Sequence, residues 1–240
     1  MDPTEYRSIV GKYMYLVTKI FPEGANAARD LTKHFANPGP EHWKSVERIV
    51  GHLKRNKESI KLTYRKPKEL RPTESADSDY NTAFDRRSVS GNLGTVGGCI
   101  TNWLSNTQHT TSLSSTEAEY YSAAKAVQTL LFKINLLDEL KSAVTPAVLA
   151  EDNTGCIYMI KNQTTTSRTK HIDIRAHLMR EHYMKDKFDV IHVDTEEQDA
   201  DILTKNLPEK EHTKHSRNLR EGRPFIYQNW EDIVMQVKKT

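Results

Sequence analysis

The chain has 240 residues, of which 36% are hydrophobic and 28% are charged, and its formal net charge is +3. This composition is typical of a folded globular protein and argues against wholesale disorder. So small a net charge does not by itself predict binding to a polyanion such as nucleic acid.

The two cysteines, Cys99 and Cys156, stand far apart and form no CxxC pair. This spacing predicts neither a disulfide framework nor a zinc site, and it favours a reducing compartment. No apolar run approaches the length that spans a membrane, and the N-terminus lacks the basic and apolar regions of a signal peptide. We therefore expect an intracellular, cytoplasmic chain that does not enter a membrane.

The first quarter of the chain is predicted to be helical, over residues 4–55. Proline and glycine at 22–24 and at 38–40 divide this region into about three helices. Residues 42–55 (HWKSVERIVGHLKR) show the three-and-four spacing of an amphipathic helix, with basic residues on its polar side. A solvated helix face explains those basic residues as well as a binding surface does.

From Ile60 onward the period changes. Residues 60–64 (IKLTY) alternate like a strand, and residues 73–112 are predicted to form a meander of short strands. A long helix then begins at Ser114 or Ser115 and runs to about Lys141. Its start carries a Ser-x-x-Glu capping box formed by Ser114 and Glu117.

The last third of the chain alternates between strands and helices. Residues 147–153 form a short apolar run that ends in acids, and 188–193 (FDVIHV) alternate as a second strand. Helices are predicted over 154–162, 170–186 and 196–207. The fold class is therefore mixed α/β, with an antiparallel portion beside a βα portion. The basic tail after Pro208 gives no clear pattern.

The predicted long helix carries two glutamates, Glu117 and Glu119, which we expect to lie on different sides of the helix. Its apolar stripe includes Ala123, and one helical step of four residues before Ala123 lies Glu119. Glu117 lies about 200° further around the helix, so we expect it to face solvent and Glu119 to face the sheet. Periodicity alone also allows Glu119 to lie at the frayed edge of the stripe, satisfied by a cap or an arginine.

Other acids occupy comparable junctions. Asp152 ends an apolar strand run where a helix begins, which is where side chains project from a sheet edge. Asp77 and Asp79 share strand parity, and neither Asp199 nor Asp201 is excluded by helical geometry. Periodicity leaves both pairs open. Taken singly, each of these acids is explained as well by an ordinary surface position.

Five collinear stretches resemble the ribonuclease H domain of Ty1/copia-type retrotransposon polyproteins. Their order and spacing match over residues 73–210, and residues 6–19 and 42–56 resemble the segment that joins polymerase to ribonuclease H in those elements. The five stretches are ADSDYN with FDRRSVSG, SLSSTEAEYYSAAKA, EDNTGCIYMI, RTKHIDIRAHLMREHY and QDADILTKNLP.

The resemblance implies a ribonuclease H-like fold, with a five-stranded mixed sheet flanked by helices and preceded by a small helical segment. We divide the chain accordingly into a helical connection segment over 1–60, a ribonuclease H-like domain over 61–210 and a C-terminal extension over 211–240. The implied activity is cleavage of the RNA strand of RNA·DNA hybrids. The implied partners are such a hybrid and the polymerase portion of the same polyprotein, in the cytoplasm and in virus-like particles.

The resemblance also implies a catalytic, metal-binding site of four carboxylates. It selects Glu119, in agreement with the helical wheel. It also selects Asp77 over Asp79 and Asp201 over Asp199, two choices that periodicity does not make, and Asp152 completes the set. Clustered oxygen ligands without His or Cys favour Mg²⁺ or Mn²⁺, and two ions suit phosphodiester hydrolysis. In this assignment Asp77 bridges the ions, Glu119 and Asp152 hold one, and Asp201 holds the other.

Basic residues are expected to grip the nucleic-acid backbone, because hybrids are recognised by shape and 2′-hydroxyls rather than by base sequence. The residues expected to do so are Arg86, Arg87, Arg168, Lys170, His171 and Arg175. For the last four, charges that merely solvate an amphipathic helix are an equally good explanation.

Two other functions stay open at this point. The chain would bind hybrid or brace a polymerase without catalysis if it were a degraded or domesticated copy, and it would cut DNA if it were a nuclease of the integrase kind. The Tyr-x-Asp-Asp signature of the polymerase is absent from the sequence. The chain is therefore not a complete reverse transcriptase.

Overall fold

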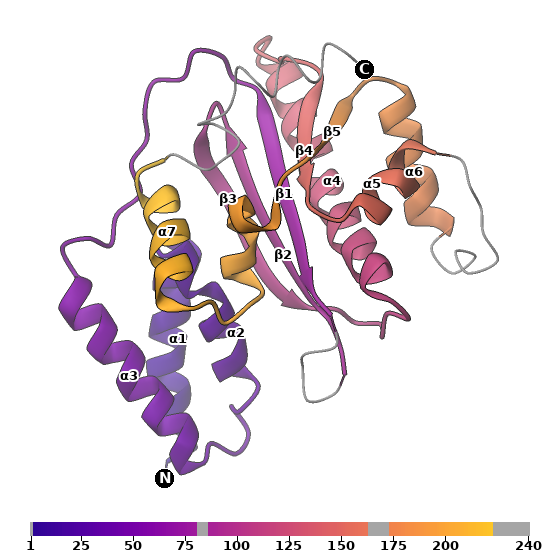
Figure 1. Ribbon diagram of the computed structural model, residues 1–240. Helices are drawn as coiled ribbons and strands as arrows, with labels where there is room; N and C mark the ends of the chain where they lie inside the picture. The colour runs from indigo at the N-terminus through magenta and orange to yellow at the C-terminus, as the bar shows by residue number, and fades with distance from the viewer. Residues whose placement is uncertain (1, 81–85, 163–172, 223–240) are drawn as a thin grey trace.

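The computed structural model describes residues 2–80, 86–162 and 173–222, without the side chains of 173–176. In the N-terminal segment, α1 (Pro3–Lys19) begins after Asp2, whose side chain accepts a hydrogen bond from the Thr4 amide. The predicted break at 22–24 is a 3₁₀ helix, η1 (Pro22–Gly24), and α2 (Ala25–Thr32) follows. With α3 (Pro40–Asn56), these elements confirm the prediction of three helices (Figure 1).

Five strands form one mixed sheet in the order β3-β2-β1-β4-β5. β1 pairs antiparallel with β2, and β2 with β3, whereas β1 pairs parallel with β4, and β4 with β5. This topology confirms the expected ribonuclease H-like fold with a five-stranded mixed sheet, in which three antiparallel strands are followed by two parallel ones. The strands are β1 (Pro72–Asp79), β2 (Val89–Val96), β3 (Cys99–Thr107), β4 (Ala147–Glu151) and β5 (Phe188–His192).

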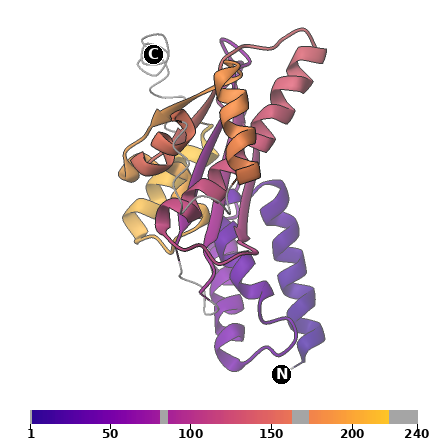
Figure 2. The ribbon, with the colours of Figure 1, turned by 90° about the vertical axis from the view of Figure 1, so that its right-hand side faces the viewer.

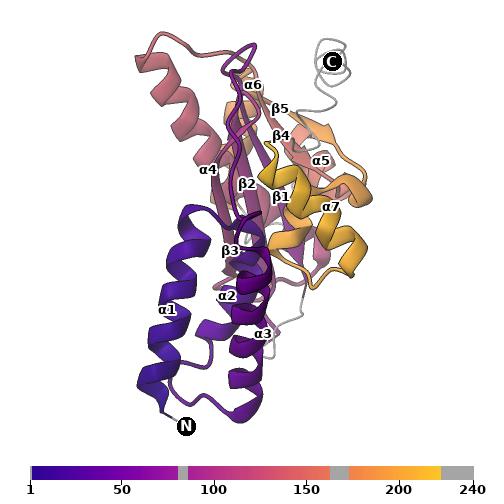
Figure 3. The ribbon, with the colours of Figure 1, turned by 90° about the vertical axis from the view of Figure 1, so that its left-hand side faces the viewer.

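Helices cover the two faces of the sheet (Figures 2 and 3). One face carries α4 (Ser115–Glu139), α5 (Thr154–Lys161) and α6 (Asp173–Met184), which enclose a core that includes Leu130, Leu149 and Phe188. The other face carries the last elements of the described chain. These are η3 (Thr195–Glu197), η4 (Asp199–Leu203) and α7 (Glu209–Arg220).

A second core joins the N-terminal helices to this other face of the sheet. Tyr6 and Val10 of α1 belong to the same buried cluster as Leu93 of β2, Leu203 of η4 and Leu219 of α7. Residues on both sides of the boundary placed at residue 60 therefore share buried apolar surface. The division of the chain into domains stays a prediction.

Two predicted elements are wrong. Residues 60–64 form no strand; Ile60 and Leu62 pack one-sidedly against the second core, which produces a period of two without strand pairing. The helix predicted over 196–207 is instead η3 and η4, because the chain turns at Gln198 and all five residues of η4 are buried. Residues 209–220, for which no element was predicted, form the regular helix α7. Among the described helices, none is long and apolar enough to cross a membrane.

Candidate active site

Asp77 and Asp152 meet because of the parallel pairing of β1 with β4. The register aligns Thr73 with Val148 and Ser75 with Ala150. Extending it by two residues places Asp77 beside Asp152, at the carboxyl ends of both strands. The Asp77 side chain is fully buried, and Asp152 is half-buried.

Asp201 reaches the same edge on η4, which lies directly against the sheet. A Cβ atom on Gly91 of β2 would come within 2.6 Å of Thr204 Cγ2 and 3.0 Å of the Ala200 carbonyl oxygen, so glycine is required for this close approach. Gln198 Nε2 donates to the Ala76 carbonyl oxygen at 3.0 Å and ties the start of η4 to β1.

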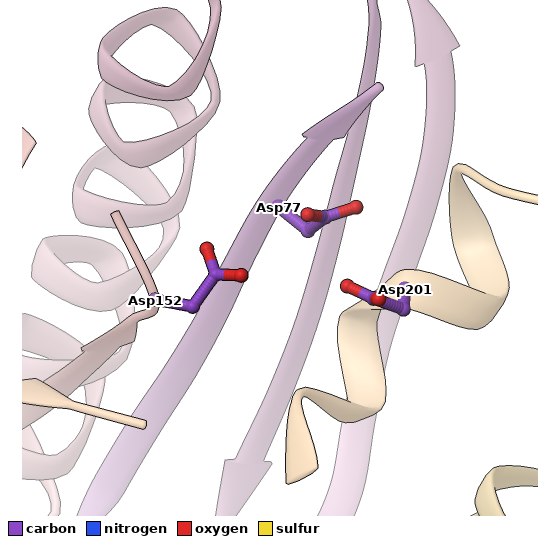
Figure 4. Close-up of side chains that lie close together, drawn as sticks. All are labelled: Asp77, Asp152 and Asp201. Carbon is purple, nitrogen blue, oxygen red and sulfur yellow. The ribbon is translucent and has the colours of Figure 1, made fainter. Parts of the chain in front are cut away.

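The three aspartates converge from three elements, and their carboxylates point toward one another (Figure 4). One carboxylate oxygen from each of Asp77, Asp152 and Asp201 lies within 4.8 Å of the other two. Lys205 Nζ contacts Asp77 Oδ1 at 3.1 Å and Asp201 Oδ2 at 3.0 Å, and the Thr204 hydroxyl donates to Asp77 Oδ2. The η4 side of the site thus has a cation from the chain itself.

Glu119 lies on the other side of the edge, in the second turn of α4. The Ser122 hydroxyl, one turn further on, donates to the Asp77 carbonyl oxygen at 2.8 Å and fixes α4 on β1. Glu119 is 7% exposed, as the helical wheel predicts for the sheet-facing position. Glu117 is instead engaged at the start of the helix. Its amide donates to Ser114 Oγ at 3.1 Å, and its carboxylate accepts from the amide of Leu113 rather than of Ser114.

A fifth carboxylate, Glu151, was not predicted from the sequence. It ends β4 immediately before Asp152 and is fully buried. One oxygen each from Glu119, Glu151 and Asp152 lies within 4.8 Å of the other two. The only signal in the sequence is that an apolar run ends in two acids, Glu151 and Asp152, rather than in one.

The structure separates the acid pairs that periodicity left open. Asp199 is buried but points to α7, where its Oδ1 lies 2.8 Å from His215 Nδ1 and accepts from Asn218 Nδ2 at 3.0 Å. Asp79 ends β1 and is half-buried, outside both groups of converging acids. Asp77 and Asp201 are therefore the members of each pair that join the cluster.

Burial and mutual repulsion make these carboxylates hard to ionise. Desolvation, and then the charge of Glu151, raise the pKa of Glu119 to about 11. Desolvation, and then Asp77, raise the pKa of Asp201 to about 8. Burial and the neighbouring Asp152 raise the pKa of Glu151 well above its usual range. Burial opposes the charge of Lys205, but Asp77 and Asp201 outweigh it and raise its pKa.

The donor set suits a hard divalent cation. All five acids offer oxygen, and neither His nor Cys belongs to either group of converging ligand atoms found in the described residues. Three buried oxygens, Glu119 Oε2, Glu151 Oε2 and Asp201 Oδ1, have no hydrogen-bond partner within the described part of the chain. Unpartnered buried carboxylate oxygens are costly unless a proton or a cation compensates them.

Of the six residues predicted to contact nucleic acid, the structure describes the side chains of two. Arg86 and Arg87 are exposed and precede β2, whose first residue pairs with Asp79, so they lie at the carboxylate end of β1. Arg175 belongs to α6, but its side chain lies outside the described residues. Arg168, Lys170 and His171 lie outside them altogether.

Comparisons with known proteins agree with the sequence motifs. No family model matches the chain. It is 32% identical over 208 residues (87% of the chain, 16% of the relative) to the retrovirus-related Pol polyprotein from transposon TNT 1-94 of Nicotiana tabacum. It is 32% identical over 220 residues (91% of the chain, 15% of the relative) to that from transposon RE2 of Arabidopsis thaliana.

The chain thus spans only about a sixth of the length of these relatives. Among solved structures, LC11-RNase H1 isolated from compost aligns with 56% of this chain and 93% of its own length, at 14% identity and a TM-score of 0.44. The chain belongs to the Pol polyprotein family of Ty1/copia-type retrotransposons, and its sheet has the ribonuclease H-like topology described above.

Proposed function

We propose that this chain is a metal-dependent endoribonuclease that cleaves the RNA strand of RNA·DNA hybrids, within a copia-like reverse-transcription machinery. The observation that carries the proposal is the convergence of Asp77, Asp152 and Asp201 at one sheet edge, with Glu119 beside them. Relatives that are retrovirus-related Pol polyproteins support the same activity. The reducing cytoplasm, including virus-like particles, is the proposed compartment.

The residues of the site divide the work of holding cations and substrate. Asp77, Asp152 and Asp201 would hold one divalent ion, and Glu119 with Asp152 would contribute to a second. In this arrangement the shared acid is Asp152, and not Asp77 as the resemblance implied. The chemistry that two bound Mg²⁺ ions supply is activation of a water molecule and stabilisation of the leaving oxygen of the diester. The products are a 5′-phosphate and a 3′-hydroxyl on the cut RNA strand.

The chain's own side chains position the substrate around that edge. Arg86 and Arg87 are exposed at the carboxylate end of β1 and are suited to contact backbone phosphates. Lys205 is 30% exposed at its side chain and extends between Asp77 and Asp201, where it offsets part of their charge. A hybrid that approaches this edge therefore meets cations beside the carboxylates.

A cleavage assay tests the proposal. We expect the folded chain to cut the RNA strand of an end-labelled RNA·DNA hybrid in Mg²⁺ or Mn²⁺, and EDTA or Asp152→Asn to abolish the cut. A well-folded preparation that leaves the hybrid intact in both metals would sink the proposal. If hybrid binding persists without cleavage and Asp152→Asn changes nothing, the chain is a non-catalytic binding module. Preferential cleavage of duplex DNA would indicate a DNA-directed nuclease instead.

A further inference from the structure

Glu151 is the buried acid that the four-carboxylate site leaves without a role. Its side chain is fully buried at the end of β4. Oε1 accepts from the Asn153 amide at 3.2 Å, whereas Oε2 has no hydrogen-bond partner in the part of the chain that the structure describes. A buried carboxylate oxygen without a partner requires an explanation.

The charged neighbours of Glu151 among the described residues are acids, and the thiol of Cys156 also lies beside it. The extended β1–β4 register places Glu151 on the same face of the sheet as Ala76, which packs against α4. There it meets Glu119, whose Oε2 also lacks a hydrogen-bond partner in the described chain. Lys205, the lysine of the site, makes its ion pairs with Asp77 and Asp201, on the opposite side of the edge.

Three ligand atoms therefore converge on the α4 side of the edge. Oxygens of Glu119, Glu151 and Asp152 lie within 4.8 Å of one another, and Asp152 also belongs to the group with Asp77 and Asp201. The cluster thus consists of two halves that share Asp152. The η4 half contains a lysine ammonium, and within the described part of the chain the α4 half brings together carboxylates alone.

We propose that Glu151 is a fifth carboxylate ligand, which holds a divalent cation of the Mg²⁺ or Mn²⁺ class together with Glu119 and Asp152. This inference rests on the metal site of the proposed function, not on its nuclease activity. The α4 half is the tighter of the two cation sites, because no ammonium group of the described residues makes an ion pair with its carboxylates. Asp152 contributes to both halves and is the acid that links them.

The test measures cation binding directly. Mn²⁺ is titrated calorimetrically into the metal-free 240-residue chain, into Glu151→Gln and Glu151→Asp, and into the control Glu117→Gln. We expect Glu151→Gln to weaken the tighter binding step by at least about tenfold, as the loss of groups around metal sites does. Glu151→Asp keeps the charge on a shorter side chain and should bind with intermediate affinity. Glu117→Gln should bind as the unchanged chain does.

Melting in EDTA distinguishes a ligand from a structural residue. Glu151→Gln relieves repulsion with Glu119 and should melt no lower than the unchanged chain. Equal Mn²⁺ affinity in Glu151→Gln and the unchanged chain, or no Mn²⁺ binding by either, would overturn the inference. If Glu151→Gln does not fold, Glu151→Asp decides, and unchanged affinity there overturns it as well.

The inference and the proposed function fail separately. Absence of hybrid cleavage by a chain that binds Mn²⁺ through Glu151 removes the nuclease activity and leaves the ligand assignment intact. If the unchanged chain cleaves hybrid but the Glu151→Gln variant binds Mn²⁺ at full affinity, the ligand assignment is removed and the nuclease activity stands.

Discussion

Two buried side chains of helix α4 each lie against a buried acid of the sheet, but only one of the two pairs is oppositely charged. Lys133 Nζ lies 2.8 Å from Glu74 Oε1 of β1, and both side chains are buried. Fourteen residues earlier, about four turns and about 21 Å along the same helix face, Glu119 lies against Glu151 of β4. One strand acid meets a cation of the chain, and the other meets another acid.

The difference shows which acids serve the fold alone. Glu74 also accepts from Asn102 Nδ2 at 3.1 Å, and Lys133 donates to the carbonyl oxygens of Thr73 and Thr95, so this pair is compensated within the chain. Glu119 and Glu151 each keep an oxygen with no hydrogen-bond partner among the described residues. An acid pair of that kind lowers stability unless a proton or an external cation joins it.

The largest effect should distinguish Glu119 from its neighbour Glu117. Glu119→Gln removes a carboxylate from the cation site, and loss of several kcal/mol of transition-state stabilisation predicts a cleavage rate about 10³-fold lower. Glu117→Gln, with the same chemical change two residues away, should cleave at the normal rate. Single-turnover cleavage of a labelled hybrid measures both. Equal losses in the two variants would show that the helix start, and not the carboxylate, matters.

The compensated pair should respond in stability instead of activity. Lys133→Met leaves Glu74 as an uncompensated buried charge and should lower the free energy of unfolding by about 3–5 kcal/mol. The double variant Lys133→Met with Glu74→Leu removes both charges and should recover most of that loss. Urea denaturation of the two variants and the unchanged chain measures the difference.

The same pair offers a clear way to break the comparison. If Lys133→Met folds with unchanged stability, Glu74 is protonated or hydrated in the folded chain, and burial alone does not distinguish structural acids from functional ones. If the double variant is as unstable as the single one, the loss reflects packing of the lysine stem rather than the charge left on Glu74.

Some residues of the site could be predicted from the sequence and others could not, for physical reasons. Glu119 was accessible because α4 has one apolar stripe, and a helical wheel resolves residues two positions apart. Asp77 and Asp79 share a face of β1, so periodicity does not separate them; the resemblance selects Asp77, and the register with β4 places it beside Asp152. That register depends on contacts between segments about seventy residues apart, which local periodicity does not contain.

Glu151 and Lys133 were missed because burial removes the pattern that would reveal them. All five residues of β4 are buried, so its two faces show no alternation of polar and apolar residues. Lys133 lies among buried residues of α4, and its partners, Glu74 and two backbone carbonyl oxygens, come from β1 and β2. The five strands of the sheet were within reach of the sequence motifs, whereas the pairing of buried charges required the packed structure.

A third test uses pH to titrate the buried acids of the site. The pKa of Asp201 is raised to about 8 and that of Glu119 to about 11, so both acids hold protons more tightly in the folded chain than in the unfolded one. Their stabilising contribution is fully present below the unfolded pKa near about 4 and is lost as pH rises through the folded values. In EDTA, the chain should therefore lose stability between about pH 5 and pH 8.

Mg²⁺ should oppose that loss, because a cation compensates the same carboxylates. At about a hundred times its dissociation constant, a bound ion contributes about 2.7 kcal/mol. Thermal melts followed by circular dichroism, in EDTA and in Mg²⁺ across this pH range, measure both effects. Glu119→Gln should show a shallower decline in EDTA, since it has one fewer acid to ionise. Parallel pH profiles with and without Mg²⁺ would contradict this account.

The smallest effect concerns the start of α4, which carries Glu119 in its second turn. Ser114→Ala removes the hydroxyl that accepts from the Glu117 amide and should lower the free energy of unfolding by about 1 kcal/mol. Because Ser122 independently fixes the helix on β1, the Mn²⁺ affinity should stay unchanged. Urea denaturation and calorimetric titration of the same preparation measure the two quantities. A loss of Mn²⁺ binding free energy larger than the loss in free energy of unfolding would show that the cap, and not Ser122, positions Glu119 against Glu151.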